Sequence, residues 1–387
     1  MQKILAAVAL VVACACGTPA GNEDSGVTGG GAATGGGASA GGGGGTTGGG
    51  SATGGGGSAT GGGSATGGGG ATGGGGATGG GGATGGGGAT GGGGATGGGG
   101  ATGGGGNPFE GIDPLADAGN AQIIDGGFQF TEGPQWVPAL GSLLFSDIQG
   151  NTIYRYTPPS SVTPFLTPSA NNNGIALAPN GDLILCQHAG RVTRMSPDGG
   201  QVVLASTFDG GTLNSPNDAV VRSDGTIYFS DPSYGGTGTV GFRGVYRITP
   251  GGQISLVYST TTGQPNGLAL SPDETILYQA DSQLSEVRRY DVAPDGTTSN
   301  GARFTLTSAG GPGGAGGDGI TTDVNGNLYV STSVGVKVYR PDAGYLGRIQ
   351  VAQEPANCAF GDADHQTLYI TARTAIFRVR LNVPGPY

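Results

Sequence analysis

From Glu132 onward the chain repeats one pattern six times, and this repeat restricts the possible folds more than any other feature. Each unit starts with an acidic or amide residue that leads into a short apolar run. The starts are Glu132, Asn173, Asn217, Asn266, Asp318 and Asn357, at spacings of 41, 44, 49, 52 and 39 residues. Turns rich in Gly, Asp, Asn and Pro separate the apolar runs, and helical periodicity is absent. We therefore predict an all-β chain.

The units also share an internal strand pattern. A second apolar run is centred 11 or 12 positions after each start, and a third run follows it. The central residues of the second run are Leu144, Ile184, Tyr228, Tyr278, Tyr329 and Tyr369. Units of three or four strands at this period are typical of propeller blades, so we predict a six-bladed β-propeller. Residues 121–125 form an apolar run that we expect to close the ring as the outer strand of the last blade.

Composition divides the chain into three segments. Residues 1–16 read as a signal peptide, with Lys3 ahead of an apolar run too short to span a bilayer. Residues 17–106 hold most of the 91 glycines, largely as ATGGGG units. Such a segment buries too little apolar surface to offset the entropy of ordering, so we expect a disordered linker, or tether. Residues 107–387 hold the repeat and are predicted to be the propeller domain.

The signal segment ends in Val11-Val12-Ala13-Cys14, which resembles the lipobox of bacterial lipoproteins. In that family the cysteine is lipidated and becomes the mature N-terminus. The resemblance therefore implies an exported envelope lipoprotein on the periplasmic or cell-surface face of a membrane, held there only by its lipid. Two alternatives are an ordinary cleaved signal peptide and modification of Cys16 instead.

Charge and cysteine content exclude several other classes. The net charge is −10 and no basic cluster occurs, so we expect no nucleic-acid partner. Cys186 and Cys358 lie in apolar, strand-like runs and are predicted to be buried free thiols. No cysteine or histidine cluster suggests zinc. We expect the protein to be a monomer.

The six unit starts are predicted to form a ring. The first strand of each propeller blade is the innermost, so equivalent residues on these strands should surround one end of the central channel. The ring would contain two carboxylates and four amides, whose oxygen atoms suit Ca²⁺ better than Mg²⁺, although another divalent cation is possible. The alternative is that the Asn-Gly and Asp-Gly pairs simply cap turns into the inner strands.

Several motifs occur in order at blade spacing. They include Phe130-Thr-Glu-Gly-Pro-Gln-Trp136, Asn214-Ser-Pro-Asn-Asp218, Tyr228-Phe-Ser-Asp-Pro-Ser-Tyr-Gly235 and Pro265-Asn-Gly-Leu-Ala269. From about Phe128 to Arg378 the chain resembles the family of senescence marker protein (regucalcin), gluconolactonase and luciferin-regenerating enzyme. The resemblance implies a six-bladed propeller with one divalent cation in its channel.

The resemblance also implies roles for individual residues. Glu132 and Asn266 match metal ligands of the family, and Asp318 matches a residue that is both a ligand and the suggested general base. Asn217 matches an asparagine that lies beside the metal or contacts substrate. Regucalcin has an arginine where this chain has Ser215, so its sugar specificity is not expected here.

Three further residues are candidates for the site. His188 ends the second strand of blade two, where similar propeller lactonases place a histidine; the alternative is a channel-wall histidine bonded to the backbone. Asn173 belongs to the ring and is a candidate substrate ligand. Arg191 could reach a substrate carboxylate, or form a salt bridge instead.

Together these features predict a Ca²⁺-dependent hydrolase that opens a small lactone, with Asp318 as base and His188 as a second candidate catalytic residue. The chain has no Gly-x-Ser-x-Gly elbow and only two histidines, which argues against a serine triad. The main alternative is a non-catalytic cell-surface binding module with a structural Ca²⁺. A strictosidine-synthase-like condensing enzyme fits the motif order less well.

We expect mass spectrometry of the mature N-terminus to find lipid on Cys14, because Val11-Val12-Ala13-Cys14 is followed directly by a polar, glycine-rich spacer. An unmodified N-terminus, or one that begins beyond Cys16, would contradict the anchor.

Overall fold

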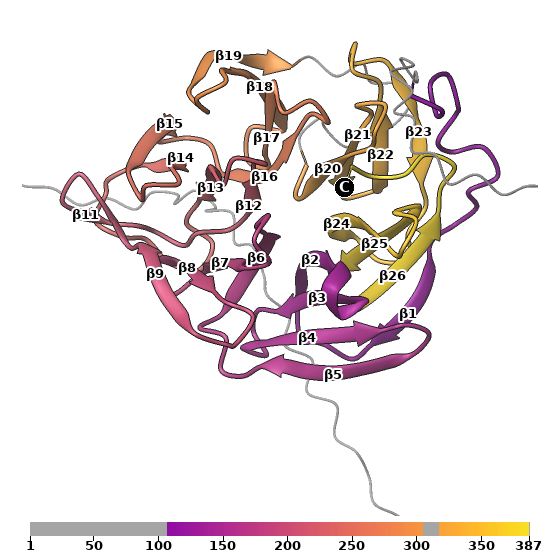
Figure 1. Cartoon of the computed structure of the whole chain (residues 1–387), viewed down its shortest axis with the longest axis horizontal. Coiled ribbons are helices and arrows are strands. Elements are labelled where there is room, and N and C mark those ends of the chain that lie inside the picture. The colour runs from indigo at the N-terminus through magenta and orange to yellow at the C-terminus, as the bar shows by residue number, and fades with distance from the viewer. Residues whose placement is uncertain (1–106, 305–316, 387) are drawn as a thin grey trace, which may run out of the picture. The chain divides into compact units, whose positions relative to one another are not determined.

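The computed structural model describes residues 107–304 and 317–386. They form the predicted six-bladed β-propeller around a central channel (Figure 1). The signal segment 1–16 with Cys14, and the linker 17–106, lie outside the described residues. The helical content of the described part is one 3-10 turn, η1 (Pro138–Leu140). No helix there is long and apolar enough to cross a membrane.

Each blade is an antiparallel sheet of four strands. The inner strands are β2 (Thr131–Val137), β6 (Asn172–Leu177), β12 (Ala219–Val221), β16 (Pro265–Leu270), β20 (Ile320–Thr322) and β24 (Pro355–Gly361). The second strands are β3 (Ser142–Asp147), β7 (Leu183–Gln187), β13 (Ile227–Asp231), β17 (Ile276–Asp281), β21 (Leu328–Thr332) and β25 (Thr367–Ala372). The third strands are β4 (Thr152–Thr157), β8 (Arg191–Met195), β14 (Arg243–Ile248), β18 (Glu286–Val292), β22 (Gly335–Tyr339) and β26 (Ala375–Arg380). The outer strands are β5 (Ser161–Leu166), β9 (Gln201–Ala205), β15 (Ile254–Thr260), β19 (Thr298–Phe304), β23 (Tyr345–Ile349) and β1 (Gln122–Gly126).

The ring closes as the sequence predicted. Strand β1 pairs antiparallel with β26 and completes the last blade from the opposite end of the domain. At the same seam Trp136 of blade one stacks on Tyr369 of blade six, with ring centroids 5.8 Å apart. Thr131 Oγ1 also donates a hydrogen bond of 2.9 Å to the Ala375 carbonyl. The seam therefore combines backbone pairing with aromatic packing.

The apolar core consists of layers between neighbouring blades. Successive strand residues point to opposite faces of a sheet, so each blade presents one apolar face to each neighbour. In β3, Leu143 packs in the layer shared with blade six, and Leu144 packs in the layer shared with blade two. Both are at most 1% exposed. The predicted centres of the other second strands are equally buried, and so are the free thiols of Cys186 and Cys358.

Around the channel the inner strands touch backbone to backbone. The Gly174 amide donates a 2.6 Å hydrogen bond to the Asn217 carbonyl, and the Gly267 amide donates one of 3.2 Å to the Asp318 carbonyl. A Cβ added to either glycine would lie 2.5 Å from the same carbonyl oxygen. Only glycine fits after these two ring residues, because any side chain would collide with the neighbouring inner strand. The turn-capping alternative does not explain this close contact.

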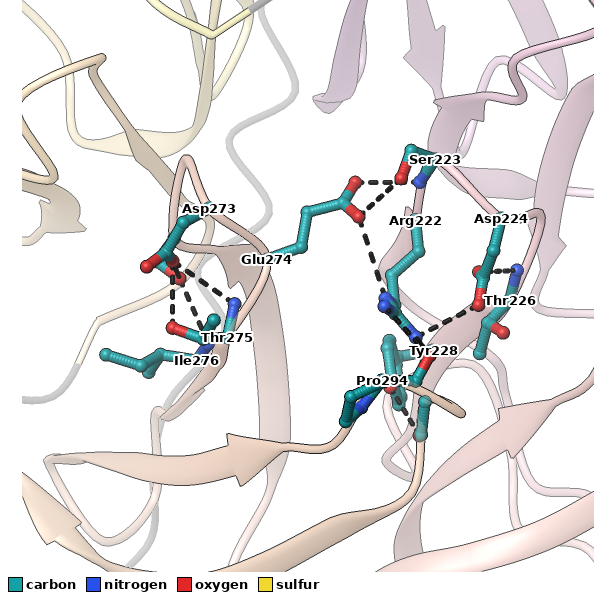
Figure 2. A network of polar contacts seen from close by, with 12 residues as sticks. Arg222, Ser223, Asp224, Thr226, Tyr228, Asp273, Glu274, Thr275, Ile276 and Pro294 are labelled. Carbon is teal, nitrogen blue, oxygen red and sulfur yellow. Dashed lines mark hydrogen bonds and ion pairs between the residues drawn. The ribbon is translucent and has the colours of Figure 1, made fainter. Parts of the chain in front are cut away.

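A polar network joins blades three and four at the end of the inner strands away from the ring residues (Figure 2). The Arg222 guanidinium contacts Asp224 at 3.0 Å and, in the next blade, Glu274 at 3.6 Å. It also donates to the Pro294 carbonyl. The Tyr228 hydroxyl donates a hydrogen bond of 2.6 Å to the Gly296 carbonyl. This network supplies polar bonds beside the apolar layer between the two blades.

We expect Arg222→Met to lower the free energy of unfolding by about 1–3 kcal/mol, because it leaves Glu274 and the Pro294 carbonyl without a partly buried cationic donor. Chemical denaturation of the full chain measures this change. Arg340→Met is the control, because its ion pair with Asp342 is 51% and 70% exposed and should contribute less than about 1 kcal/mol. Equal losses in the two variants would contradict a special role for the network.

Candidate functional site

A cavity of about 580 Å³ opens at the end of the channel where the inner strands begin. Its walls combine polar residues of the inner strands with residues of the adjoining loops. The lining residues are Phe130, Glu132, Ile148, Gln149, Asn171, Asn173, His188, Ala189, Asn217, Tyr234, Gly235, Asn266 and Asp318. The structure therefore brings five of the six predicted ring residues, together with His188, to one cavity.

Buried aspartates hold the segments that lead into three of the inner strands. Asp147, Asp231 and Asp281 each end the second strand of a blade. The carboxylate of each aspartate accepts a hydrogen bond of 2.9 Å from a backbone amide that lies two or three positions before the ring residue of the same blade. The donor amides are those of Phe130, Asn214 and Gln264, respectively. This repeated contact fixes where Glu132, Asn217 and Asn266 enter the cavity.

Asn357, the sixth ring residue, does not line the cavity. Its Oδ1 accepts a hydrogen bond of 2.8 Å from the Cys358 amide, and its side chain hydrogen-bonds to Glu132. Asn357 therefore belongs to the predicted ring through its contact with Glu132, but its side chain bonds within the protein and supports the Glu132 carboxylate.

Glu132 and Asp318 place two carboxyl groups at the channel, where Glu132 is 3% exposed and Asp318 is partly buried. Burial, followed by the nearby charge of Asp318, raises the pKa of Glu132 well above its ordinary value. Burial also raises the pKa of Asp318 to about 7, while a hydrogen bond from Asn266 opposes the shift. Both groups would ionise more readily beside a cation, since an opposite charge favours the ionised form.

Asp218 is a third buried carboxyl group near this pair, and sequence reasoning did not select it. Its oxygens accept hydrogen bonds of 2.9 Å from the amides of Ala219 and Leu268, on two neighbouring inner strands. Burial raises its pKa to about 7. The Asn-Asp pair at positions 217 and 218 was the available signal, but only the structure shows that Asp218 points to a neighbouring blade.

His188 lies at the cavity wall beside Asn173. Its Nε2 is 3.2 Å from Asn173 Nδ2. Burial lowers the pKa of His188 to about 4, so the ring is neutral near pH 7. Because the amide nitrogen can only donate, Nε2 accepts and the ring proton lies on Nδ1. Asn173 Oδ1 is buried and has no hydrogen-bond partner among the described residues.

Tyr234, also not predicted, extends from the β13–β14 connection to the cavity. Its hydroxyl accepts a hydrogen bond of 3.3 Å from Asn266 Nδ2. The same connection is held by Ser215, whose Oγ donates to the Pro232 carbonyl at 2.9 Å and accepts from the Gly235 amide at 3.1 Å. Ser215 therefore positions this loop and does not line the cavity.

Arg191 is not among the lining residues of the cavity. Its Nε donates a hydrogen bond of 2.6 Å to Gln187 Oε1, which is also an acceptor for Thr193. It forms no ion pair with any described residue, so the salt bridge considered from the sequence is not found. Arg191 orders the end of blade two.

The cavity has the donor chemistry of a hard-cation site. Two carboxylates and several amide side chains line it, and its lining within residues 107–304 and 317–386 includes no lysine or arginine. Ca²⁺ takes oxygen ligands of this kind. Glu132, Asn266 and Asp318, with Asn217 beside them, are the residues that could hold such an ion.

Comparisons with known proteins agree with this architecture. Residues 130–374 match the SMP-30/Gluconolactonase/LRE-like region. Gluconolactonase of Zymomonas mobilis is 32% identical over 309 residues, which cover 71% of this chain and 85% of that protein. Pentonolactonase of Haloferax volcanii is 29% identical over 65% of this chain and 84% of its own length. The solved gluconolactonase of Xanthomonas campestris superposes with a TM-score of 0.63 at 31% identity, covering 70% of this chain and 91% of the other.

We expect Glu132→Ala to weaken Ca²⁺ binding by at least roughly tenfold, because the number of charged ligands strongly tunes calcium affinity. Isothermal calorimetry on the full chain measures the affinity. Asp364→Ala is the control, since that carboxylate is 53% exposed and pairs with Arg380. Unchanged affinity in Glu132→Ala would remove this residue from the ligand set.

Proposed function

This chain belongs to the SMP-30/gluconolactonase/LRE-like family, and on that premise we propose that it hydrolyses a neutral aldonolactone with the help of a bound Ca²⁺. The observation that carries the proposal is the meeting of Glu132 and Asp318 with amide side chains in one cavity, where no lysine or arginine is found among the described lining residues. Family relatives named gluconolactonase and pentonolactonase support lactonase activity.

The charge of the cavity argues for an uncharged substrate. An anionic lactone would meet two carboxylates and no cationic side chain among the described lining residues, so its charge would compete with those carboxylates and with the carbonyl oxygen for the bound Ca²⁺. Neutral hydroxyl groups fit the lining better, because amides such as Asn173 and Asn217 can both donate and accept hydrogen bonds.

Opening a lactone forms a bond between water and the carbonyl carbon and breaks the bond from that carbon to the ring oxygen, so the proton that water loses is balanced by one that the leaving ring oxygen takes up as it becomes a hydroxyl. Asp318 is the proposed acceptor of the proton that water loses, since its carboxyl group lines the cavity and a carboxylate within reach of the attacking water can serve as a general base. Glu132 would then serve as a ligand and charge partner.

His188 has a different proposed role. With a pKa near 4 it carries no charge at neutral pH, and its Nε2 is occupied by the Asn173 amide. We assign it to orienting the side chain of Asn173, which lines the cavity. This replaces the catalytic role considered from the sequence with a positioning role.

Calcium bound by Glu132, Asn266 and Asp318 would supply Lewis acidity at the substrate carbonyl oxygen, where negative charge develops during hydrolysis. The side chains that line the cavity would hold the ion and the substrate.

We also propose that the enzyme acts at the cell envelope, attached through Cys14 and separated from the membrane by residues 17–106. A glycine-rich coil of about 90 residues would have a typical reach of roughly 50 Å. The support for this location is the lipobox-like sequence alone.

We expect Asp318→Asn to lower the turnover of glucono-1,5-lactone by about 10²–10⁴-fold while most Ca²⁺ binding remains, because the amide keeps an oxygen donor but cannot accept the proton. Turnover is followed by acid release in a weakly buffered solution, and metal binding by calorimetry. Asp295→Asn, in an exposed turn, is the control and should behave like the wild type.

Two results would overturn the proposal. Full activity in Asp318→Asn would show that this carboxylate is not the base. An inactive wild-type chain at saturating Ca²⁺, or one whose activity survives EDTA, would contradict metal-dependent lactone hydrolysis.

A further inference from the structure

A second hollow adjoins the cavity, and the two share His188 and Ala189 in their walls. It is an open groove of about 460 Å³ that runs from His188 over blades two and three. Hydroxyl groups and glycine backbone dominate its lining. We call it the threonine groove, and its principal residues are Ser206, Thr207, Thr212, Gly236, Thr237 and Gly238.

The groove is built from segments that do not belong to any blade. One is the short hairpin of β10 (Thr207–Phe208) and β11 (Gly211–Thr212), which pairs outside the four-stranded sheets. Figure 1 shows β11 beside blades two and three. The other is the connection 232–242 between β13 and β14. The six four-stranded sheets close the ring without these segments. Ring closure therefore does not explain why they lie beside the cavity.

The hairpin and the connection are fixed to each other. The amides of Thr239 and Val240 each donate a 3.1 Å hydrogen bond to the Thr212 carbonyl. The Thr212 amide in turn donates a hydrogen bond of 2.9 Å to Thr239 Oγ1. A Cβ on Gly238 would lie 2.2 Å from the Thr212 carbonyl oxygen, so the two backbones are in direct contact.

Asn214 anchors the same two segments from inside the protein. Its side chain is buried and donates to Asp231 Oδ2 at 3.0 Å and to the Phe242 carbonyl at 2.9 Å. Its Oδ1 accepts a hydrogen bond of 3.0 Å from the Gly238 amide. The groove is therefore pre-formed, which reduces the entropy lost when a ligand binds.

The chemistry of the groove favours a neutral, hydroxyl-rich ligand. Its lining in the described part of the chain includes no Asp, Glu, Lys or Arg. The hydroxyls of Ser206, Thr207 and Thr237 form no hydrogen bond with any described residue, so they remain available to donate and accept. A sugar ring presents matching donors and acceptors, whereas an anion or an apolar chain would find few partners here.

We propose that the threonine groove is a subsite for a neutral glycosyl unit, and that the preferred substrate is a glycosylated aldonolactone. The inference rests on the proposed lactonase function. The lactone ring would occupy the cavity at Glu132 and Asp318, and the attached sugar would pass His188 into the groove.

The test compares cellobionolactone with glucono-1,5-lactone on the full-length chain. We expect kcat/KM to be about tenfold higher for cellobionolactone, equivalent to about 1.4 kcal/mol. Thr207→Trp fills the groove and should remove that preference while leaving glucono-1,5-lactone hydrolysis within about twofold of wild type. Thr207→Val keeps the shape but lacks the hydroxyl, and should reduce the preference by about three- to tenfold.

Val203→Trp is the matched control, because Val203 is 50% exposed on β9 and is not a groove residue. It should keep the preference of the wild type. Equal kcat/KM for the two lactones in the wild type, or an unchanged preference in Thr207→Trp, would overturn the subsite.

Calorimetry with cellobiitol and glucitol separates this inference from the proposed function, since neither compound can be hydrolysed. We expect cellobiitol to bind about tenfold more tightly, and only in chains with an open groove. If neither lactone is hydrolysed but this difference appears, the glycosyl subsite stands and the lactonase proposal fails. Equal binding of the two alditols would refute the subsite.

Discussion

The close contact between inner strands around the channel is the constraint on which the rest of the structure depends. Amide-to-carbonyl bonds such as Gly174 to Asn217 and Gly267 to Asp318 leave no space for a Cβ at the donor residue. The residue before each of these glycines then lies at the mouth of the channel and lines the cavity. The close approach of the inner strands therefore both closes the ring and places the ring residues at the cavity.

The close approach of the inner strands also brings carboxyl groups together in surroundings of low polarity, where they repel one another. Burial holds the pKa of Asp218 and of Asp318 at about 7, well above the usual value of an aspartate. A carboxyl group with a raised folded-state pKa favours folding at low pH, and this contribution is lost as the pH rises toward 7. The metal-free chain thus has a site that opposes its own folding at neutral pH. The apolar layers between the blades must compensate, and a bound cation would relieve the repulsion.

The residues proposed to bind the cation are held by the blades, whereas the residues proposed to select the substrate lie on connections outside the blades. The sheets and their inter-blade layers hold Glu132, Asn266 and Asp318 in place, as expected for a site built on rigid elements. The β10–β11 hairpin and the connection 232–242 belong to no blade, yet they form the wall beyond His188. Related propellers could keep the same cation chemistry and accept different substrates through changes in such connections alone.

The sequence by itself determined the repeat and much of its consequence. The spacing of the unit starts predicted six blades, the run at 121–125 predicted the strand that closes the ring, and the ring composition identified Glu132 and Asp318 as facing one channel. These features are periodic, so they can be read along a single chain. The roles of Asp218, Tyr234, Asn357 and Arg191, and the existence of the threonine groove, depended on tertiary structure. Each arises from contacts between side chains or loops of different strands and blades, and no local pattern specifies which partner a side chain will meet once the ring has closed.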